Sequence, residues 1–140
     1  AASDVYKRQA FIDRLKSGDY KFESCDFREL QDEDWNDKTF VYADPPYLIT
    51  CATYNEQDGW NEELEKELLA YLDNLNERGI RFALSNVLKS KGKENSILID
   101  WVNKNMSKYR VIYLDYSYSN SNYHTKDRTS KTDEVLIVNY

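Results

Sequence analysis

Hydrophobic and polar positions along the chain repeat with two different periods. From Leu64 to Leu75 apolar side chains recur every three or four residues, which predicts a helix capped by Asn61 and ended by Gly79. A second amphipathic helix is expected at 94–106, and a short helix should end near Lys16. The positions expected to face the core are Leu64, Leu68, Tyr71, Leu72 and Leu75 in the first helix, and Ile97, Leu98, Trp101 and Val102 in the second.

Short apolar runs bounded by polar or turn residues predict strands at 20–25, 40–43, 80–84, 110–115 and 134–140. Strands and helices alternate through most of the chain, which is typical of an α/β fold with a parallel sheet. No helix separates the last two strands, so they should pair antiparallel at one edge. The run 40–43 is apolar at every position, and we therefore expect a central strand buried on both faces.

Polar side chains follow two of these strands at the point where each ends. The sequence Asp-Pro-Pro-Tyr, residues 44–47, comes directly after the strand 40–43, and Ser85 and Asn86 end the strand 80–84. Proline cannot donate to a sheet ladder, so the chain must leave the sheet here. Ligands bind at the carboxyl ends of parallel strands, which favours a site at this edge. An ordinary turn is the simpler interpretation, because proline and aspartate are common turn residues.

A second acidic and aromatic pair, Asp26 and Phe27, follows the strand predicted at 20–25. A turn with a core phenylalanine explains this pair as well as a binding role does. Ser85 and Asn86 are likewise consistent with a plain turn or helix cap.

Composition limits the class of protein. The 140 residues include 41% hydrophobic and 14% aromatic side chains, enough for one core, and no apolar run approaches the ~20 residues that span a bilayer. Cys25 and Cys51 make neither a disulfide framework nor a zinc cluster, and His124 has no ligand partners at metal spacing. We therefore expect a soluble, cytoplasmic protein without a metal site.

The net charge of −6 conceals an asymmetry along the chain. Residues 23–77 contain 16 acidic and 3 basic side chains, a balance of −13, whereas residues 78–131 contain 4 acidic and 11 basic ones, a balance of +7. Such a division allows one part of the protein to meet a polyanion. Charged runs are also common on faces that only contact water.

The segment 44–47 resembles the Asp-Pro-Pro-Tyr catalytic motif of methyltransferases that act on amino groups of nucleobases. Its surroundings are similar to the Dam-like, D12 class DNA adenine N6-methyltransferases. The resemblance extends over 11–140 and includes "CDF", "LSN" and the closing "RTSKTDEVLIVNY". It implies a partial class I, Rossmann-like fold that uses S-adenosylmethionine: the C-terminal half of the sheet, with an antiparallel edge hairpin.

The resemblance also implies catalytic roles. The Asp44 carboxylate and the Pro45 carbonyl would accept hydrogen bonds from the adenine amino group and make its nitrogen a better nucleophile. Pro45 and Pro46 would hold that carbonyl rigidly without offering an N–H donor. Tyr47 would stack on a base that has been flipped out of the duplex.

Further residues are expected to hold the cofactor and DNA. By the same resemblance, Asp26 would accept from the amino group of the cofactor's adenine, Phe27 would lie beside that ring, and Asp44 would also face the methionine end. The polar loop 116–133 would contact the phosphate backbone of double-stranded DNA. The residues expected to bind nucleic acid are Tyr47, Lys126, Arg128 and Lys131.

The chain is expected to be part of an enzyme. Residues 1–10 resemble a translated sequencing adapter, so we expect a non-native scar there and, in 11–140, the C-terminal part of a single methyltransferase catalytic domain. The family's glycine-rich cofactor loop does not occur in 11–140, and this fragment should be inactive alone. We expect a monomer that binds DNA, with or without a cognate restriction endonuclease.

Two alternatives remain open at this point. The enzyme could methylate RNA adenine or another planar amine, although the protein glutamine methyltransferases usually carry Asn in place of this Asp. The chain could also be a non-catalytic nucleic-acid-binding module that kept the fold.

Overall fold

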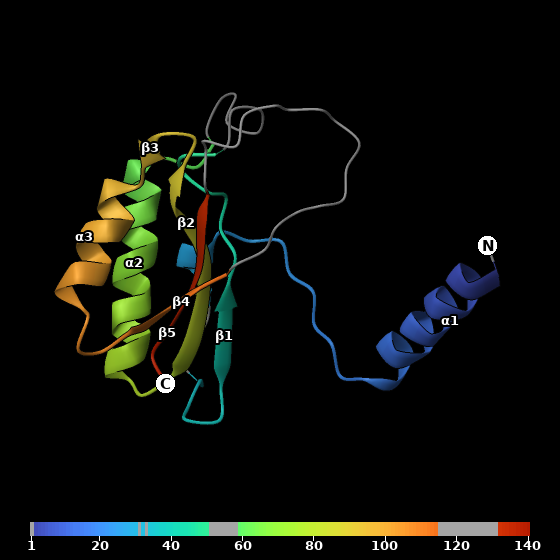
Figure 1. The fold of residues 1–140 in the computed structure, drawn as a ribbon. Coiled ribbons are helices and arrows are strands. Elements are labelled where there is room, and N and C mark those ends of the chain that lie inside the picture. The colour runs from blue at the N-terminus through green and yellow to red at the C-terminus, as the bar shows by residue number, and fades with distance from the viewer. Residues whose placement is uncertain (1, 31, 33, 51–58, 115–131) are drawn as a thin grey trace. The chain divides into compact units, whose positions relative to one another are not determined.

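The computed structural model describes every residue except 1, 31, 33, 51–58 and 115–131 (Figure 1). The chain forms two compact units, Ala1–Gln31 and Asp32–Tyr140. The first unit contains helix α1 (Ala2–Ser17) and one 3-10 turn, η1 (Phe27–Glu29). Helix α1 ends where the sequence predicted, and it includes residues 2–10.

The strand predicted at 20–25 is wrong. These residues have no strand pairing in the described part of the chain, and Tyr20 and Phe22 remain exposed. An apolar alternation makes a strand only where a neighbouring strand completes its hydrogen bonds. Among the described residues of this unit, no element offers that ladder.

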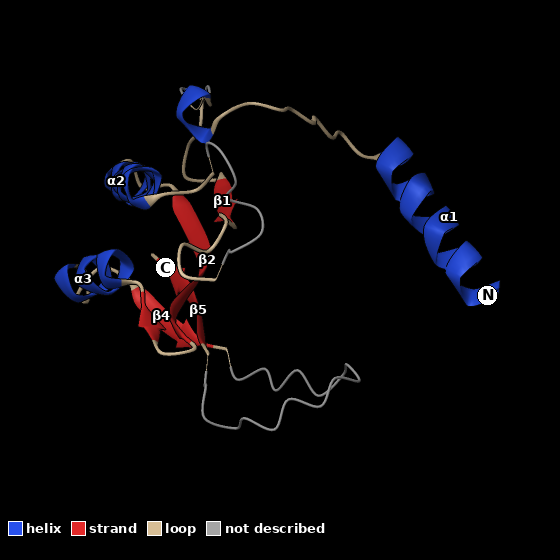
Figure 2. Cartoon of the chain, turned by 90° about the horizontal axis from the view of Figure 1, so that it is seen from above, coloured by secondary structure: helices blue, strands red, loops and turns tan. Residues whose placement is uncertain are grey.

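The second unit is a mixed sheet with two helices on one of its faces (Figures 1 and 2). Its long strands lie in the order β1-β2-β5-β4, and the short β3 pairs with β2. Strand β1 is parallel to β2, whereas β5 is antiparallel to both β2 and β4. The strands are β1 (Phe40–Ala43), β2 (Arg81–Ser90), β3 (Lys93–Glu94), β4 (Arg110–Tyr113) and β5 (Asp133–Val138).

The predicted α/β class and the antiparallel pairing of the last two strands are confirmed. The unit β1–α2–β2 is the parallel part. Strand β5 then lies between β2 and β4 and is antiparallel to both.

Strand β1 is not the fully buried central strand that its apolar sequence predicted. It has one neighbour, β2, among the described strands, and the side chains of Phe40 and Tyr42 are 50% and 58% exposed. These two residues are in register with Arg81 and Ala83 of β2. An apolar run shows that a strand is suited to burial, but the neighbouring elements decide whether it is buried.

Helices α2 (Glu62–Glu77) and α3 (Ser96–Lys104) cover one face of the sheet (Figure 2). The Asn61 side chain accepts from two backbone N–H groups of the first turn of α2, as predicted, and Gly79 follows the helix with φ +74°. The Asn95 side chain caps α3 and accepts from the Leu98 N–H. Fully buried core side chains at this layer include Leu72, Leu75, Ile80, Phe82, Leu84, Leu98, Val135 and Ile137.

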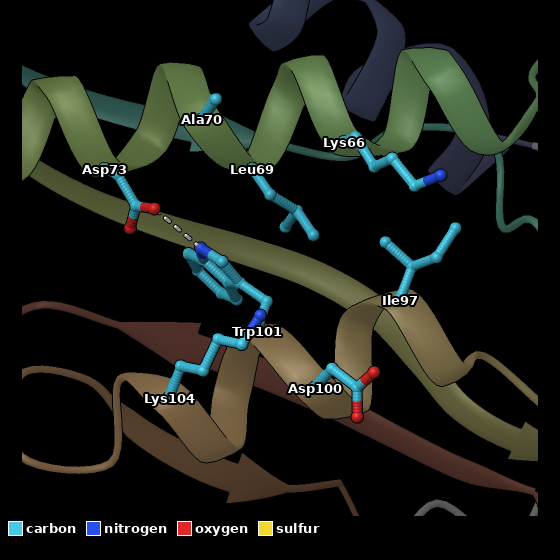
Figure 3. A pocket seen from close by; sticks show the side chains of 8 residues that line it. All are labelled: Lys66, Leu69, Ala70, Asp73, Ile97, Asp100, Trp101 and Lys104. Carbon is cyan, nitrogen blue, oxygen red and sulfur yellow. Dashed lines mark hydrogen bonds between the residues drawn. The ribbon is translucent and has the colours of Figure 1, made fainter.

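The two helices meet at a carboxylate. Asp73 of α2 accepts a hydrogen bond of 3.0 Å from the Trp101 indole of α3 (Figure 3). It accepts a second one of 2.6 Å from the Tyr109 hydroxyl. Burial raises the pKa of Tyr109, and the hydrogen bond with Asp73 and its charge raise it further. Beside this contact lies a hollow of about 360 Å³ between the helices, lined by Leu69, Trp101 and charged side chains.

None of the described helices is both long and apolar enough to cross a membrane.

Candidate active site

The site begins where β1 ends. Ala43 is the last β1 residue and pairs with Leu84 of β2, so Asp44 and Ser85 are the next residues of two parallel neighbours. Asp44 is exposed, and Tyr47 is half-buried. The sequence prediction that the "LSN" segment lies beside Asp44 is confirmed, because Ser85 directly follows the β2 partner of Ala43.

A chain of hydrogen bonds joins this edge. The Tyr47 hydroxyl donates to Asp44 Oδ1 at 3.3 Å and lies 3.0 Å from Ser85 Oγ. Because the phenol has one proton and directs it to Asp44, Ser85 is the donor to Tyr47. The bond to Asp44 is longer than the usual ~2.7–2.8 Å of O–H···O bonds, so it orients the carboxylate weakly. Among the described residues this is the only hydrogen bond of the Asp44 carboxylate.

The surroundings of Tyr47 keep its phenol protonated. Burial raises the pKa of Tyr47. The hydrogen bond with Ser85 opposes this rise, and the charges of Asp44 and Glu134 add to it. The hydroxyl therefore remains a donor near neutral pH while part of the ring is exposed.

Ser85 and Asn86 lie in the middle of β2 and do not end a strand as the sequence predicted. Strand β2 continues to Ser90, and the chain turns back into β3 through Lys91 and Gly92, both with positive φ. The residues differ in direction: Ser85 contacts Tyr47, whereas Asn86 is fully buried and contacts α2. In the sequence these two consecutive polar residues looked like a strand end, but each forms a hydrogen bond on its own face of the sheet: Ser85 with Tyr47, and Asn86 with Glu65.

One buried residue of this region was missed by sequence reasoning. Glu65, in the first turn of α2, has no exposed surface, and its carboxylate accepts from Trp60, Asn86 and Asn95. In the sequence it looked like one of several acids at a helix start. Its spacing from Leu68 and Leu69 places it on the apolar stripe, and this was the signal that could have identified it.

Asp26 and Phe27 belong to the first unit, and their geometry is local. Asp26 does not end a strand but caps η1, where its carboxylate accepts from Arg28 N, Nε and Nη2 at 2.8–2.9 Å. The side-chain hydrogen bonds from Arg28, followed by the one from its backbone N–H, lower the pKa of Asp26 to about 2. A carboxylate has about four acceptor positions, so about one is left for a ligand.

Three residues expected to meet DNA phosphates lie outside the described residues: Lys126, Arg128 and Lys131. His124 and residues 51–58 also lie outside them. In the part of the chain that the structure describes, no cluster of three or more His, Cys, Asp or Glu side chains could hold a metal ion.

Most of the chain matches a known protein family. Residues 4–132 match the D12 class N6 adenine-specific DNA methyltransferase family. The chain belongs to this family. The resemblance inferred from Asp-Pro-Pro-Tyr and its surroundings is confirmed.

Curated relatives are modification enzymes of bacteria. The chain is 42% identical over 135 residues to modification methylase StsI of Streptococcus sanguinis, and 40% identical over 134 residues to type II methyltransferase M.FokI of Planomicrobium okeanokoites. Each match covers 93% of this chain but 20% of the relative. Modification methylase LlaI of Lactococcus lactis subsp. lactis is 48% identical over 73 residues, 49% of this chain and 12% of that protein. This member of the D12 class thus spans about a fifth of the length of its first two relatives.

Proposed function

We propose that the complete protein transfers a methyl group from S-adenosylmethionine to the N6 amino group of adenine at specific sites in DNA. The observation that supports this most directly is the Asp44–Tyr47–Ser85 arrangement at the carboxyl end of β1, in a chain of the D12 class. An exposed carboxylate at the carboxyl end of a strand, oriented by a half-buried tyrosine, suits recognition of an amino group. We further propose that residues 11–140 are the C-terminal part of one catalytic domain.

Asp44 and the Pro45 carbonyl would act on the target nitrogen. The lone pair of an exocyclic amino group is delocalised into the ring, and two acceptors on its hydrogens favour the pyramidal, nucleophilic form. When bound, S-adenosylmethionine would supply the methyl group as its S–CH3 bond breaks, and its sulfur would leave as a neutral thioether. The Asp44 carboxylate would stabilise the positive charge that the amino nitrogen acquires before that nitrogen loses a proton. Because Pro45 and Pro46 have no N–H, they offer the base no competing donor.

Tyr47 would receive the flipped base. Its hydroxyl is held by Asp44 and Ser85, so the plane of the ring is set by the sheet, and the exposed part of the ring is available for stacking. Base stacking on an aromatic side chain contributes ~1–3 kcal/mol. The hydroxyl contacts thus prepare the ring for one orientation of the base.

Two groups of residues would each hold one part of the cofactor. S-adenosylmethionine supplies an electrophilic methyl group on a sulfonium. Asp26 retains about one acceptor position for an adenine amino group, and Phe27 is half-buried next to it in sequence, so this pair fits the role that the resemblance gave it. Asp44 would also face the methionine end.

The test of the function is direct. The complete protein is incubated with DNA and S-adenosylmethionine carrying a labelled methyl group, and the DNA is digested to nucleosides. We expect the label only in N6-methyl-2′-deoxyadenosine. Label in a cytosine product, or transfer to RNA in preference to DNA, would contradict the proposal.

DNA contact by the loop 116–133 has its own test. Replacing Lys126, Arg128 and Lys131 together with glutamine should weaken binding similarly on cognate and non-cognate duplexes, because phosphate contacts do not depend on sequence. The slope of log affinity against log salt should flatten by up to about one unit for each phosphate contact that the substitutions remove. Cofactor affinity should not change. An unaltered slope would mean that these cations only face solvent.

The remaining proposals concern context. We propose a monomer in the cytoplasm, with or without a cognate restriction endonuclease. We also propose that residues 1–10 are a non-native scar, which the upstream nucleotide sequence would test.

A further inference from the structure

The carboxylate of Glu65 is fully buried and is used by three donors. Its Oε2 accepts from the Trp60 indole at 2.6 Å, and its Oε1 accepts from the side-chain amides of Asn86 at 3.1 Å and Asn95 at 2.9 Å. These donors come from the residue before the α2 cap, from β2 and from the cap of α3. A buried carboxylate is costly unless its oxygens are hydrogen-bonded, and here both are.

Each amide that Glu65 holds also satisfies backbone. With its Nδ2 directed to Glu65, Asn86 turns its Oδ1 to the Val87 N–H at 2.7 Å, next to the irregularity in the β2–β5 ladder. In the same manner, Asn95 directs Oδ1 to the Leu98 N–H and donates its backbone N–H to the Leu88 carbonyl of β2. The carboxylate therefore fixes β2 at two points.

The point held at Asn86 is adjacent to the active site. Asn86 directly follows Ser85, and successive strand side chains point to opposite faces. One face of this dipeptide is tied to Glu65, and the other holds the Tyr47 hydroxyl at 3.0 Å. A shift of β2 at Asn86 would move Ser85 and, through Tyr47, the Asp44 carboxylate.

We propose that Glu65 is a positioning residue of methyl transfer, acting on Asp44 through Asn86, Ser85 and Tyr47. This inference depends on the proposed function for its kinetic test, but its structural test does not. Glu65 would not touch the base or the cofactor. Its role would be to hold the strand from which the catalytic carboxylate is aligned.

Two substitutions of Glu65 separate this role from simple core stability. Glu65→Met keeps the length of the side chain but removes both acceptors, so Asn86 and Asn95 lose their partner. Glu65→Gln can place its carbonyl at the Oε1 position and keep both amides, losing only the Trp60 contact. In the complete protein we expect kcat to fall at least ~10-fold for Glu65→Met and less than ~3-fold for Glu65→Gln, with the KM for DNA changed less than ~2-fold.

Asp73 provides a matched control. It lies on the same helix and likewise accepts from a tryptophan indole, that of Trp101 (Figure 3). Its second partner is Tyr109 rather than a residue adjacent to Ser85. Asp73→Leu should lower the melting temperature as Glu65→Met does, yet leave kcat within ~2-fold. Equal losses of kcat in both variants, measured well below melting, would overturn the proposal.

A double-mutant cycle tests the route. If Glu65 acts through Ser85, then Glu65→Met combined with Ser85→Ala should lose no more kcat than the larger single loss. Multiplied losses would overturn the route. If Glu65→Met does not fold, Asn86→Ala takes its place, because Glu65 keeps Trp60 and Asn95 there. Asn86→Ala must also lower kcat, and its loss of kcat must not multiply with that of Ser85→Ala in the double variant.

Hydrogen exchange supplies a readout that needs no turnover. The Thr50 N–H is bonded to the Tyr47 carbonyl, so the peptide 44–50 reports on the catalytic turn. We expect faster exchange of this peptide in Glu65→Met, but not in Asp73→Leu. An inactive wild-type protein with this exchange pattern would contradict the proposed function only. An active wild-type protein in which neither kcat nor exchange responds to Glu65→Met would contradict the inference only.

Discussion

Two acidic and aromatic pairs, Asp44 with Tyr47 and Asp26 with Phe27, look alike in sequence but are held in different ways. The first is oriented by a hydrogen bond between Tyr47 and Ser85, residues 38 positions apart. The second is held by Arg28, two residues from Asp26. One pair depends on the assembled sheet, and the other depends on its own turn.

This difference separates two ways of preparing a carboxylate for binding. A contact between distant segments forms only when β1 and β2 are in register, so Asp44 is aligned by the fold itself. A contact within one turn is available before the rest of the chain folds, and it occupies most of the carboxylate it orients. We therefore expect catalysis to respond strongly to changes at the first pair and weakly to changes at the second.

The largest effect should come from Asp44. In the complete protein, Asp44→Ala should reduce methyl transfer by roughly two orders of magnitude or more, about 3 kcal/mol of activation barrier. The melting temperature should hardly change, because the side chain is exposed and makes one long hydrogen bond among the described residues. Turnover is measured with labelled cofactor at saturating DNA. Near-normal turnover at normal stability would make Asp44 an ordinary turn residue.

A smaller effect is expected from Tyr47→Phe, which keeps the ring and removes the hydroxyl. The base can still stack, but neither Ser85 nor Asp44 then orients the ring. We expect kcat to fall about 10-fold, or about 1.4 kcal/mol, with DNA affinity nearly unchanged. Tyr47→Ala should weaken DNA binding as well. If Tyr47→Phe is as active as the wild type, the hydrogen-bond chain has no role in alignment.

Sequence reasoning succeeded where one signal determines the outcome. The helix 62–77 followed from its apolar period and its Asn61 cap, and the meeting of Asp44 with the "LSN" segment followed from parallel strands. The antiparallel pairing of the last two strands followed from the lack of a helical pattern between them in the sequence.

It failed where the partner of a segment lies elsewhere in the chain. Residues 20–25 have strand-like composition but no neighbouring strand in the described part of the chain, and β1 is apolar but lies at the edge of the described sheet. Asn86 looked like a strand end because its hydrogen-bond acceptor, the Glu65 carboxylate, is 21 residues away in the sequence. Local patterns give propensities, whereas long-range contacts decide which of them are realised.

The smallest effect is expected at Asp26 and is best seen by titration. Arg28 lowers the pKa of the Asp26 carboxyl to about 2, so Arg28→Gln should return it toward the ordinary value near ~3.9. Because the folded pKa is depressed, the stabilisation by Arg28 is present above the unfolded pKa near ~4 and is lost as pH falls through about 2. Acid unfolding of wild type and Arg28→Gln should therefore differ above pH ~4 and converge below pH ~2.

The loss of stability in Arg28→Gln should be small. Much of a contact between residues 26 and 28 can persist in the unfolded chain, so the difference in stability above pH ~4 should be small although the carboxyl pKa values differ. Carboxyl titration by NMR supplies the pKa, and Lys21→Gln, whose ion pair is with Glu23, serves as the control for removal of a nearby charge. Methyl transfer at saturating cofactor should change less than ~3-fold. A loss comparable to that of Asp44→Ala would show that the Asp26 turn also aligns the reaction, and the distinction between the two pairs would then fail.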